Sequence, residues 1–222
     1  MTVAKTAKSG AEERVKAAIS ELSASLSEYK KEFGGNCPVI YGGSPMPPTP
    51  PQNLLETCTF VIDRDEILRR LPKGGRFAEI GTLYGDFAVK ITNIVKPDEL
   101  HIFDLSFHHM TDTNKARILP STVYHKGYSW TELSKMEEGY FDVTYVDADH
   151  SYASVSKDLE EAYRVTKPGG YIVCNDYTVW SFPQAIPYGV YAAVNEFAIK
   201  KKLQFAYFAL QPHGFYDVAL RR

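Results

Sequence analysis

The chain has 222 residues, 44% of them hydrophobic, which suits one domain of about 150–200 residues with a sizeable core, plus an extension. Its 25 basic and 27 acidic side chains give a net charge of −2, so no basic excess indicates a nucleic-acid partner. No apolar run reaches the roughly 18 residues of a membrane-spanning helix, and Cys37, Cys58 and Cys174 lack the spacing of a zinc site or disulfide framework. We therefore expect a cytoplasmic protein that binds neither membranes nor nucleic acid.

The N-terminal segment, residues 1–60, is expected to be an extension of the main domain, residues 61–222. Residues 11–31 predict a helix, because six apolar or small side chains share one stripe at helical spacing: Val15, Ala18, Ile19, Leu22, Leu26 and Tyr29. The proline-rich segment from Pro45 to Pro51 fits neither a helix interior nor a central strand. The extension either packs on a neighbour or on a second copy of the chain, making a homo-oligomer, or covers the active site.

Beyond Asp63 the sequence alternates between strand and helix patterns. Strands are predicted at 76–80, 99–104, 121–125, 141–147 and 170–175, with helices at 64–71, 85–95 and 151–166. Such alternation indicates a parallel sheet with helices on both faces, the doubly wound or Rossmann-like α/β class. The end of the chain differs: a helix over 190–201 precedes two strands, 203–210 and 215–220, whose short connection makes them antiparallel.

The first of these strands ends in Glu79-Ile80-Gly81, and a Gly-x-x-x-Gly turn then leads through Gly85 to Asp86. Dinucleotide sites use Gly-x-Gly-x-x-Gly, whose backbone N–H groups face a pyrophosphate. Here one glycine is missing and the carboxylate of Glu79 precedes the loop, which disfavours phosphate and suits a ligand with an ammonium group. S-adenosylmethionine is such a ligand. The alternative is an ordinary strand–turn–helix connection.

The next two strand ends carry further candidate cofactor residues. Asp104 lies 104 − 85 = 19 residues beyond Gly85, where one carboxylate can accept hydrogen bonds from both ribose hydroxyls. The alternative role for Asp104 is a helix N-cap. After the third strand, Tyr128 or Trp130 is a candidate to stack on adenine and Ser129 to contact its edge, with surface packing as the alternative.

The fourth and fifth strand ends are expected to be neighbours of the first, which brings five polar side chains together: Asp147, Asp149, His150, Asn175 and Asp176. Carboxylates in one cleft repel each other unless a positive charge lies between them. A divalent ion held by Asp147 and Asp176 would lower the pKa of a substrate hydroxyl, and Asp149 or His150 would take the proton. The alternative is that Asp147 caps the following helix and His150 packs beneath it.

Together these motifs resemble the class I S-adenosylmethionine-dependent methyltransferases over roughly residues 60–222. Within that class the chain is similar to small-molecule O-methyltransferases related to the macrocin and aminocoumarin sugar enzymes and to cephalosporin hydroxylase-like proteins. The segments that carry the resemblance are Glu79-Ile80-Gly81, Gly85-Asp86, Asp104, Asp147-Ala148-Asp149-His150-Ser151-Tyr152, Lys157-Asp158-Leu159, Lys167-Pro168-Gly169-Gly170, Asn175-Asp176-Tyr177, and the late segment with Gly189-Val190 and Val194-Asn195-Glu196-Phe197.

The resemblance implies a seven-stranded sheet with a reversed last strand and S-adenosylmethionine as cofactor, with magnesium as a further candidate. It places Glu79 and Gly81 beside the methionine part of the cofactor and Asp104 on the ribose. The full set of candidate cofactor residues is Glu79, Gly81, Tyr84, Gly85, Asp86, Asp104, Ser129 and Asp147. Metal-dependent relatives use an acid after strand four and a pair of acids after strand five, which match Asp147 and the pair Asn175-Asp176. Asn175 departs from this pattern, because an amide replaces a carboxylate.

The predicted function is methylation of a hydroxyl on a small molecule such as a sugar or polyketide, with His150 or Asp149 as the base. The aromatic and proline-containing segment 178–188 is expected to contact the substrate through Trp180, Phe182 and Tyr188, or else to pack at a subunit interface. Two alternatives remain: a protein that binds the cofactor without methyl transfer, and a hydroxylase-like enzyme.

Overall fold

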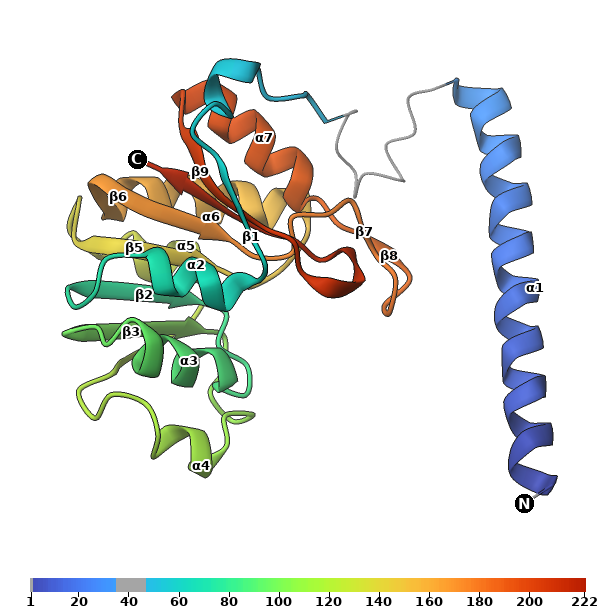
Figure 1. Ribbon diagram of the computed structural model, residues 1–222, viewed down its shortest axis with the longest axis horizontal. Coiled ribbons are helices and arrows are strands. Elements are labelled where there is room, and N and C mark those ends of the chain that lie inside the picture. The colour runs from blue at the N-terminus through green and yellow to red at the C-terminus, as the bar shows by residue number, and fades with distance from the viewer. Residues whose placement is uncertain (1, 35–46) are drawn as a thin grey trace. The chain divides into compact units, whose positions relative to one another are not determined.

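The computed structural model describes residues 2–34 and 47–222. The chain divides into two compact units, residues 1–38 and 39–222. Helix α1 (Thr2–Phe33) belongs to the first unit, and the other described elements belong to the second (Figure 1). Cys37 and the first two residues of the proline-rich segment lie outside the described residues.

Helix α1 confirms the predicted N-terminal helix and extends it to 32 residues. Val15, Ile19 and Leu22 of the predicted apolar stripe are exposed on it. Packing of this face on another surface therefore stays a prediction. In the described part of the chain, no helix is both long enough and apolar enough to cross a membrane.

The second unit is built on a sheet that, among the described residues, has eight strands in the order β1-β9-β10-β6-β5-β2-β3-β4 (Figure 1). Strands β6, β5, β2, β3 and β4 are parallel, whereas β10 is antiparallel to both of its neighbours. This arrangement confirms the predicted Rossmann-like sheet with a reversed last strand. The bounds are β1 Thr59–Val61, β2 Arg76–Ile80, β3 Glu99–Asp104, β4 Val123–Lys126, β5 Phe141–Val146, β6 Thr166–Cys174, β9 Gln204–Ala209 and β10 Asp217–Arg221.

Strand β1 is the one addition to the seven predicted strands of the sheet. It pairs in parallel with β9 at the edge of the sheet, with Phe60 opposite Phe208. Only Val61 of its three residues is buried, so it has too short and too exposed a pattern to be recognised in the sequence. It matters to the site because the chain runs directly from it into α2 (Arg64–Arg70).

Helices cover both faces of the sheet. Successive side chains of a strand point to opposite faces, so a strand can contribute buried side chains to two cores. Phe77 of β2 belongs to a core that includes α2 and α3, and its neighbour Ala78 to a core that includes α6 and α7. The remaining helical elements and the small β7–β8 hairpin lie in the connections. Their bounds are η2 Gln52–Leu54, α3 Asp86–Ile94, α4 Asp112–Lys115, α5 Ser129–Leu133, α6 Tyr152–Val165, β7 Trp180–Ser181, β8 Ile186–Pro187, α7 Val190–Lys201 and η3 Pro212–Gly214.

The carboxyl ends of the parallel strands meet at one edge, where doubly wound folds bind their ligands. Strand β2 lies between β3 and β5, and β6 follows β5, so the predicted neighbours are confirmed. Helix α2 begins at the same edge: the side chain of Asp63 accepts a hydrogen bond from the backbone N–H of Glu66 (2.8 Å) and caps it. Arg64, its first residue, is thereby brought to the site.

Candidate active site

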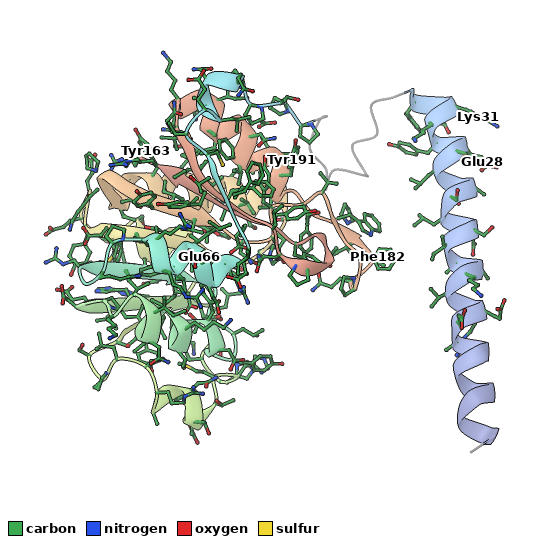
Figure 2. All side chains as sticks on the ribbon, viewed as in Figure 1. Glu28, Lys31, Glu66, Tyr163, Phe182 and Tyr191 are labelled. Atoms are coloured by element: carbon green, nitrogen blue, oxygen red, sulfur yellow. The ribbon has the colours of Figure 1, made fainter. Side chains whose placement is uncertain are left out.

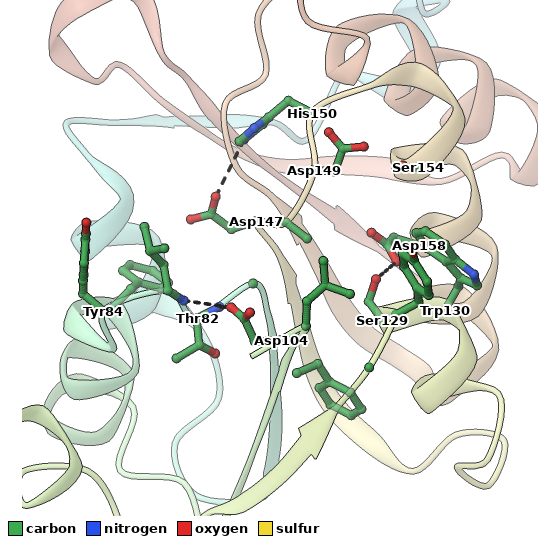
Figure 3. A pocket seen from close by; sticks show the side chains of 18 of the residues that line it. Thr82, Tyr84, Asp104, Ser129, Trp130, Asp147, Asp149, His150, Ser154 and Asp158 are labelled. Carbon is green, nitrogen blue, oxygen red and sulfur yellow. Dashed lines mark hydrogen bonds and ion pairs between the residues drawn. The ribbon is translucent and has the colours of Figure 1, made fainter. Parts of the chain in front are cut away.

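A cleft of about 560 Å³ opens at this edge of the sheet (Figure 3). Most of the predicted cofactor residues line it, together with both candidate bases. Those that do are Gly81, Tyr84, Asp86, Asp104, Ser129, Asp147, Asp149 and His150. Glu79 and Gly85 are not among the lining residues, and Asn175 and Asp176 line a second cleft instead.

Gly81 brings the loop after β2 against the loop after β5. Its φ is +86°, and a Cβ atom there would lie 1.9 Å from the carbonyl oxygen of Asp147. Only glycine tolerates that conformation and that approach. Gly85 also has a positive φ, but a Cβ there would meet the Met110 side chain at 2.7 Å, so this glycine serves packing at the start of α3.

Glu79 lies beneath the loop and has no exposed surface. The Thr82 hydroxyl donates a hydrogen bond to its Oε2 atom (2.8 Å), and its Oε1 atom has no partner among the described residues. Burial raises the pKa of Glu79 to about 8; the Thr82 bond acts in the opposite direction, and the nearby Asp104 raises the pKa further. Glu79 therefore lies behind the surface of the cleft, and its predicted interaction with the ligand would come from beneath the loop.

Asp104 lines the cleft and also fixes its loop. Its Oδ2 atom accepts the backbone N–H groups of Thr82 (3.0 Å) and Leu83 (2.9 Å), and its Oδ1 atom accepts that of Ser106 (3.0 Å). A carboxylate has about four acceptor positions, so one of those on Oδ1 is left for a ligand hydroxyl. Asp104 is not a helix cap, because the following helix, α4, is capped by Thr111.

The opposite end of the cleft holds a pair that includes Asp158 of α6, a residue to which the sequence assigned no role. The Ser129 hydroxyl donates to its Oδ1 atom (2.5 Å), while its Oδ2 atom is buried without a partner among the described residues. Burial raises the pKa of Asp158 to about 6, against the effect of the Ser129 bond. Trp130 stacks on Tyr128 beside this pair, with ring centroids 4.9 Å apart (Figure 3).

His150 lies between two carboxylates at the other end of the cleft. Its Nε2 atom is 3.4 Å from Oδ2 of Asp176 and 3.8 Å from Oδ1 of Asp147, and its ring stacks on Tyr188. Burial lowers the pKa of His150, although Asp176 and Asp149 oppose this, so the ring is neutral and able to accept a proton at neutral pH. The Asp149 carboxylate is exposed and accepts a hydrogen bond from the Ser151 hydroxyl (2.7 Å).

A cation that the sequence did not reveal lies beside these acids. The Arg64 Nη1 atom is 3.8 Å from Oδ2 of Asp147, and the guanidinium lies 4.6 Å from the centre of the Phe87 ring. Burial alone would lower the pKa of Arg64, but the nearby Tyr145, Asp217 and Asp147 outweigh it and raise the pKa. Arg64 therefore remains charged.

The predicted magnesium ligands do not fit a metal site. Asn175 is only 5% exposed, and its amide nitrogen donates to the buried Asp217 (3.0 Å), which also accepts a bond from the Tyr145 hydroxyl. No cluster of three His, Cys, Asp or Glu side chains in the described ranges has metal-binding geometry. A positive charge beside Asp147 comes from Arg64, and these observations do not support the expected divalent ion.

A second cleft of about 340 Å³ adjoins the first. Of the described residues, only Arg64 lines both. Tyr188 of the predicted substrate segment lines this cleft, whereas Trp180 and Phe182 do not, and contact with a substrate stays a prediction. Phe182 is 74% exposed between β7 and β8 (Figure 2). The lining residues are Arg64, Asn175, Asp176, Ser181, Pro183, Gln184, Tyr188, Gln211, Pro212 and Phe215.

Comparison with known proteins agrees with this architecture. Residues 78–177 match the family model of a methyltransferase domain. N-methyltransferase NodS from Bradyrhizobium japonicum is 15% identical with a TM-score of 0.53, over 72% of this chain and 94% of that one. A SAM-dependent methyltransferase from Aquifex aeolicus is 16% identical with a TM-score of 0.54, over 72% and 89%. The chain has the class I S-adenosylmethionine-dependent methyltransferase fold.

A curated relative extends the match at the level of sequence. Uncharacterized protein R132 of Acanthamoeba polyphaga mimivirus is 31% identical over an alignment of 149 positions, and the alignment covers 61% of this chain. The match spans 63% of the length of that relative. The name of this relative assigns it no activity, so the comparison shows a similarity of sequence and indicates no substrate.

The class I methyltransferase fold implies S-adenosylmethionine as cofactor, and the residues of the first cleft fit it. Gly81 leaves room where any Cβ would collide with the neighbouring loop. Two buried carboxylate oxygens, on Glu79 and Asp158, have no partner among the described residues and lie beneath or beside the cleft. The cofactor carries an ammonium group and an adenine amino group, which are hydrogen-bond donors of the kind such oxygens require.

Proposed function

We propose that the protein transfers the methyl group of S-adenosylmethionine to a hydroxyl of a small molecule. The observation that carries this proposal is the contact between the two clefts. Arg64 lines both, and His150 of the first cleft lies 3.4 Å from Asp176 of the second. A cofactor in the larger cleft and an acceptor in the smaller one would meet at these side chains.

The residues of the first cleft would hold the cofactor by its two ends. Asp104 would accept a ribose hydroxyl through Oδ1, and Ser129 and Asp158 would contact the adenine edge. Glu79 would attract the ammonium group from beneath the loop. When bound, S-adenosylmethionine supplies a methyl group on a positively charged sulfur, which keeps the electrons of the broken carbon–sulfur bond as the acceptor oxygen bonds to carbon.

His150 is the base in this proposal. As the acceptor oxygen forms its new bond, its proton passes to Nε2 of His150, whose lowered pKa favours the neutral ring beforehand. Asp176 lies close enough to stabilise the imidazolium that results. Asp176 also has a left-handed backbone (φ +51°), a conformation that its short polar side chain tolerates. Positioning of the reactants would supply much of the remaining rate.

The second cleft suits an acceptor that carries several hydroxyl groups. Its wall combines amide and hydroxyl side chains, from Gln184, Gln211 and Ser181, with the rings of Tyr188 and Phe215. Amides and hydroxyls both donate and accept hydrogen bonds, and flat rings pack against the apolar face of a sugar-like ring. We therefore place sugars and polyhydroxylated natural products first among the candidate acceptors.

Transfer of a labelled methyl group from S-adenosylmethionine to a panel of hydroxylated small molecules tests this function. We expect an O-methylated product, and we expect His150→Gln to lower kcat about 10²–10⁴-fold because the general base is lost. Binding of S-adenosylhomocysteine by the His150→Gln variant should be unchanged. Label found on a nitrogen or carbon atom, or full activity of this variant, would contradict the proposal.

Asp158 is expected to decide which purine the first cleft accepts. When Asp158 is ionised, its free Oδ2 atom is a hydrogen-bond acceptor and cannot donate. It can therefore accept a hydrogen bond from the 6-amino group of adenine, but it would repel the oxo group of hypoxanthine, which is also an acceptor. Asp158→Asn can turn an N–H donor toward the oxo group. We expect wild type to prefer S-adenosylhomocysteine over S-inosylhomocysteine by at least about tenfold, and the variant to lose or reverse this preference.

Calorimetric titration of both compounds measures this preference. Ser154→Ala, at another residue that lines the cleft, serves as the control and should retain the adenine preference. Equal affinities of wild type for the two compounds would remove Asp158 from the account without affecting the proposed transfer.

A further inference from the structure

Arg64 lines both clefts, and its guanidinium places a positive charge where the two clefts meet. Neither lining set contains another arginine or any lysine among the described residues. Four carboxyl groups, those of Glu79, Asp147, Asp176 and Asp217, interact electrostatically with its guanidinium. We propose that Arg64 takes the place and the charge of the divalent ion that the acid motifs predict, as a built-in cation of the acceptor site. This inference rests on the proposed function for its role, although its charge can be tested separately.

The position of Arg64 is fixed on three sides. The Asp63 side chain caps the helix in which Arg64 is the first residue. The guanidinium packs on the Phe87 ring, and Asp147 lies 3.8 Å from Nη1. A cation held in this way needs no further ordering when a ligand arrives, which is the condition for electrostatic stabilisation of a reacting oxygen.

Asn175 is the complement of this arrangement. In the metal-binding pattern its position carries an acid, whereas here its amide nitrogen is bonded to Asp217 and adds no negative charge. A site with one carboxylate fewer and one guanidinium more has little attraction for a divalent cation. Asn175 removes a negative charge from the site and Arg64 adds a positive one. Both differences from the metal-binding pattern therefore change the charge of the site in the same direction.

The role that follows for Arg64 is to position the acceptor. A guanidinium has five N–H donors, and only part of them can be directed at Asp147. The N–H groups that face the second cleft would hold the reactive hydroxyl. They would also stabilise the negative charge that develops on its oxygen as the proton moves to His150. A metal ion would act on the same oxygen in the same direction.

Binding of Mn²⁺, followed by electron paramagnetic resonance on protein freed of metals with a chelator, tests the inference without any acceptor. We expect wild type to bind Mn²⁺ only weakly at this site. Arg64→Met, which keeps the bulk and removes the charge, should bind Mn²⁺ at least about tenfold more tightly, because Asp147 and Asp176 lose their counter-charge. The gain should disappear in Arg64→Met combined with Asp147→Asn.

Arg64→Lys is the matched control, since it keeps the charge and should gain no Mn²⁺ site. Arg64→Gln provides a second uncharged variant should the methionine variant fold poorly, with folding checked by circular dichroism. Wild type that binds Mn²⁺ as tightly as the uncharged variants, or uncharged variants that gain no site, would overturn the inference. Titration of the same samples with S-adenosylhomocysteine keeps the two proposals apart, because its failure would refute the proposed function alone.

Discussion

Replacement of Gly81 by alanine is expected to lower the free energy of unfolding by about 2–5 kcal/mol and to abolish binding of S-adenosylmethionine. The left-handed backbone costs a residue with a Cβ about 1–2 kcal/mol. The methyl group would lie 1.9 Å from the carbonyl oxygen of Asp147, so the two loops must separate, at a further cost typical of overpacking, about 1–3 kcal/mol. Because these loops form the floor of the first cleft, the cofactor loses its site.

Gly169→Ala is the matched control for Gly81→Ala. Gly169 has a similar φ of +80°, but a Cβ there would meet no atom within 4 Å. Its substitution should cost only the backbone term of about 1–2 kcal/mol and leave cofactor binding intact. Denaturant unfolding and calorimetric titration of both variants measure these quantities. Equal losses of stability and unchanged affinity in both would show that the close approach at Gly81 is not real.

Glu79→Gln is expected to stabilise the cofactor-free protein at alkaline pH. The folded-state pKa of Glu79 is raised to about 8 from 4.5, so the folded protein holds a proton that the unfolded chain releases. Its stability contribution is complete below the unfolded pKa and is lost as pH rises through the folded pKa. At about pH 9 the buried carboxylate would cost wild type on the order of 4 kcal/mol, which the glutamine does not incur.

The same variant should bind S-adenosylmethionine about tenfold more weakly, because a glutamine cannot release a proton to form the carboxylate that the ammonium group would stabilise. Urea unfolding from about pH 6 to pH 9 measures the first effect, and calorimetric titration the second. Thr82→Val supplies an opposite control: it removes the bond that lowers the pKa of Glu79, so its stability should fall more steeply with pH than that of wild type. Parallel stability profiles for wild type and Glu79→Gln would contradict the buried placement of this carboxyl group.

The sheet could be predicted because its strands and helices alternate over long, strongly patterned segments. The exception, β1, has three residues and one buried side chain, and it exists because β9 offers a free edge. Local pattern cannot reveal a strand of that kind, since the stabilising contacts come from a segment more than 140 residues away.

The site was predictable where motifs follow the carboxyl ends of strands. Asp104, Asp147 and His150 line the first cleft as expected. Arg64 and Asp217 were missed because neither belongs to a motif: Arg64 opens a short surface-like helix, and Asp217 begins the reversed last strand. The requirement for a positive charge among the acids was correctly inferred from repulsion, but the sequence could not distinguish an arginine from a metal ion.

Asp158 belongs to a segment that carries the resemblance, yet the sequence assigned it no role in the site. It lies within α6, and its side chain is fully buried. Burial of a carboxyl group on a helix depends on what packs against it, here the loop that carries Ser129. A contact of that kind, 29 residues apart in the chain, appears only in the folded structure.

Calorimetric titration of the purified protein with S-adenosylhomocysteine tests the central claim most directly, because the first cleft must recognise the spent cofactor whatever the acceptor is. The account predicts micromolar binding that Asp104→Ala abolishes, since this carboxylate both fixes the loop and holds the ribose. Absence of binding of both S-adenosylhomocysteine and S-adenosylmethionine by the wild-type protein, folded by circular dichroism, would contradict it.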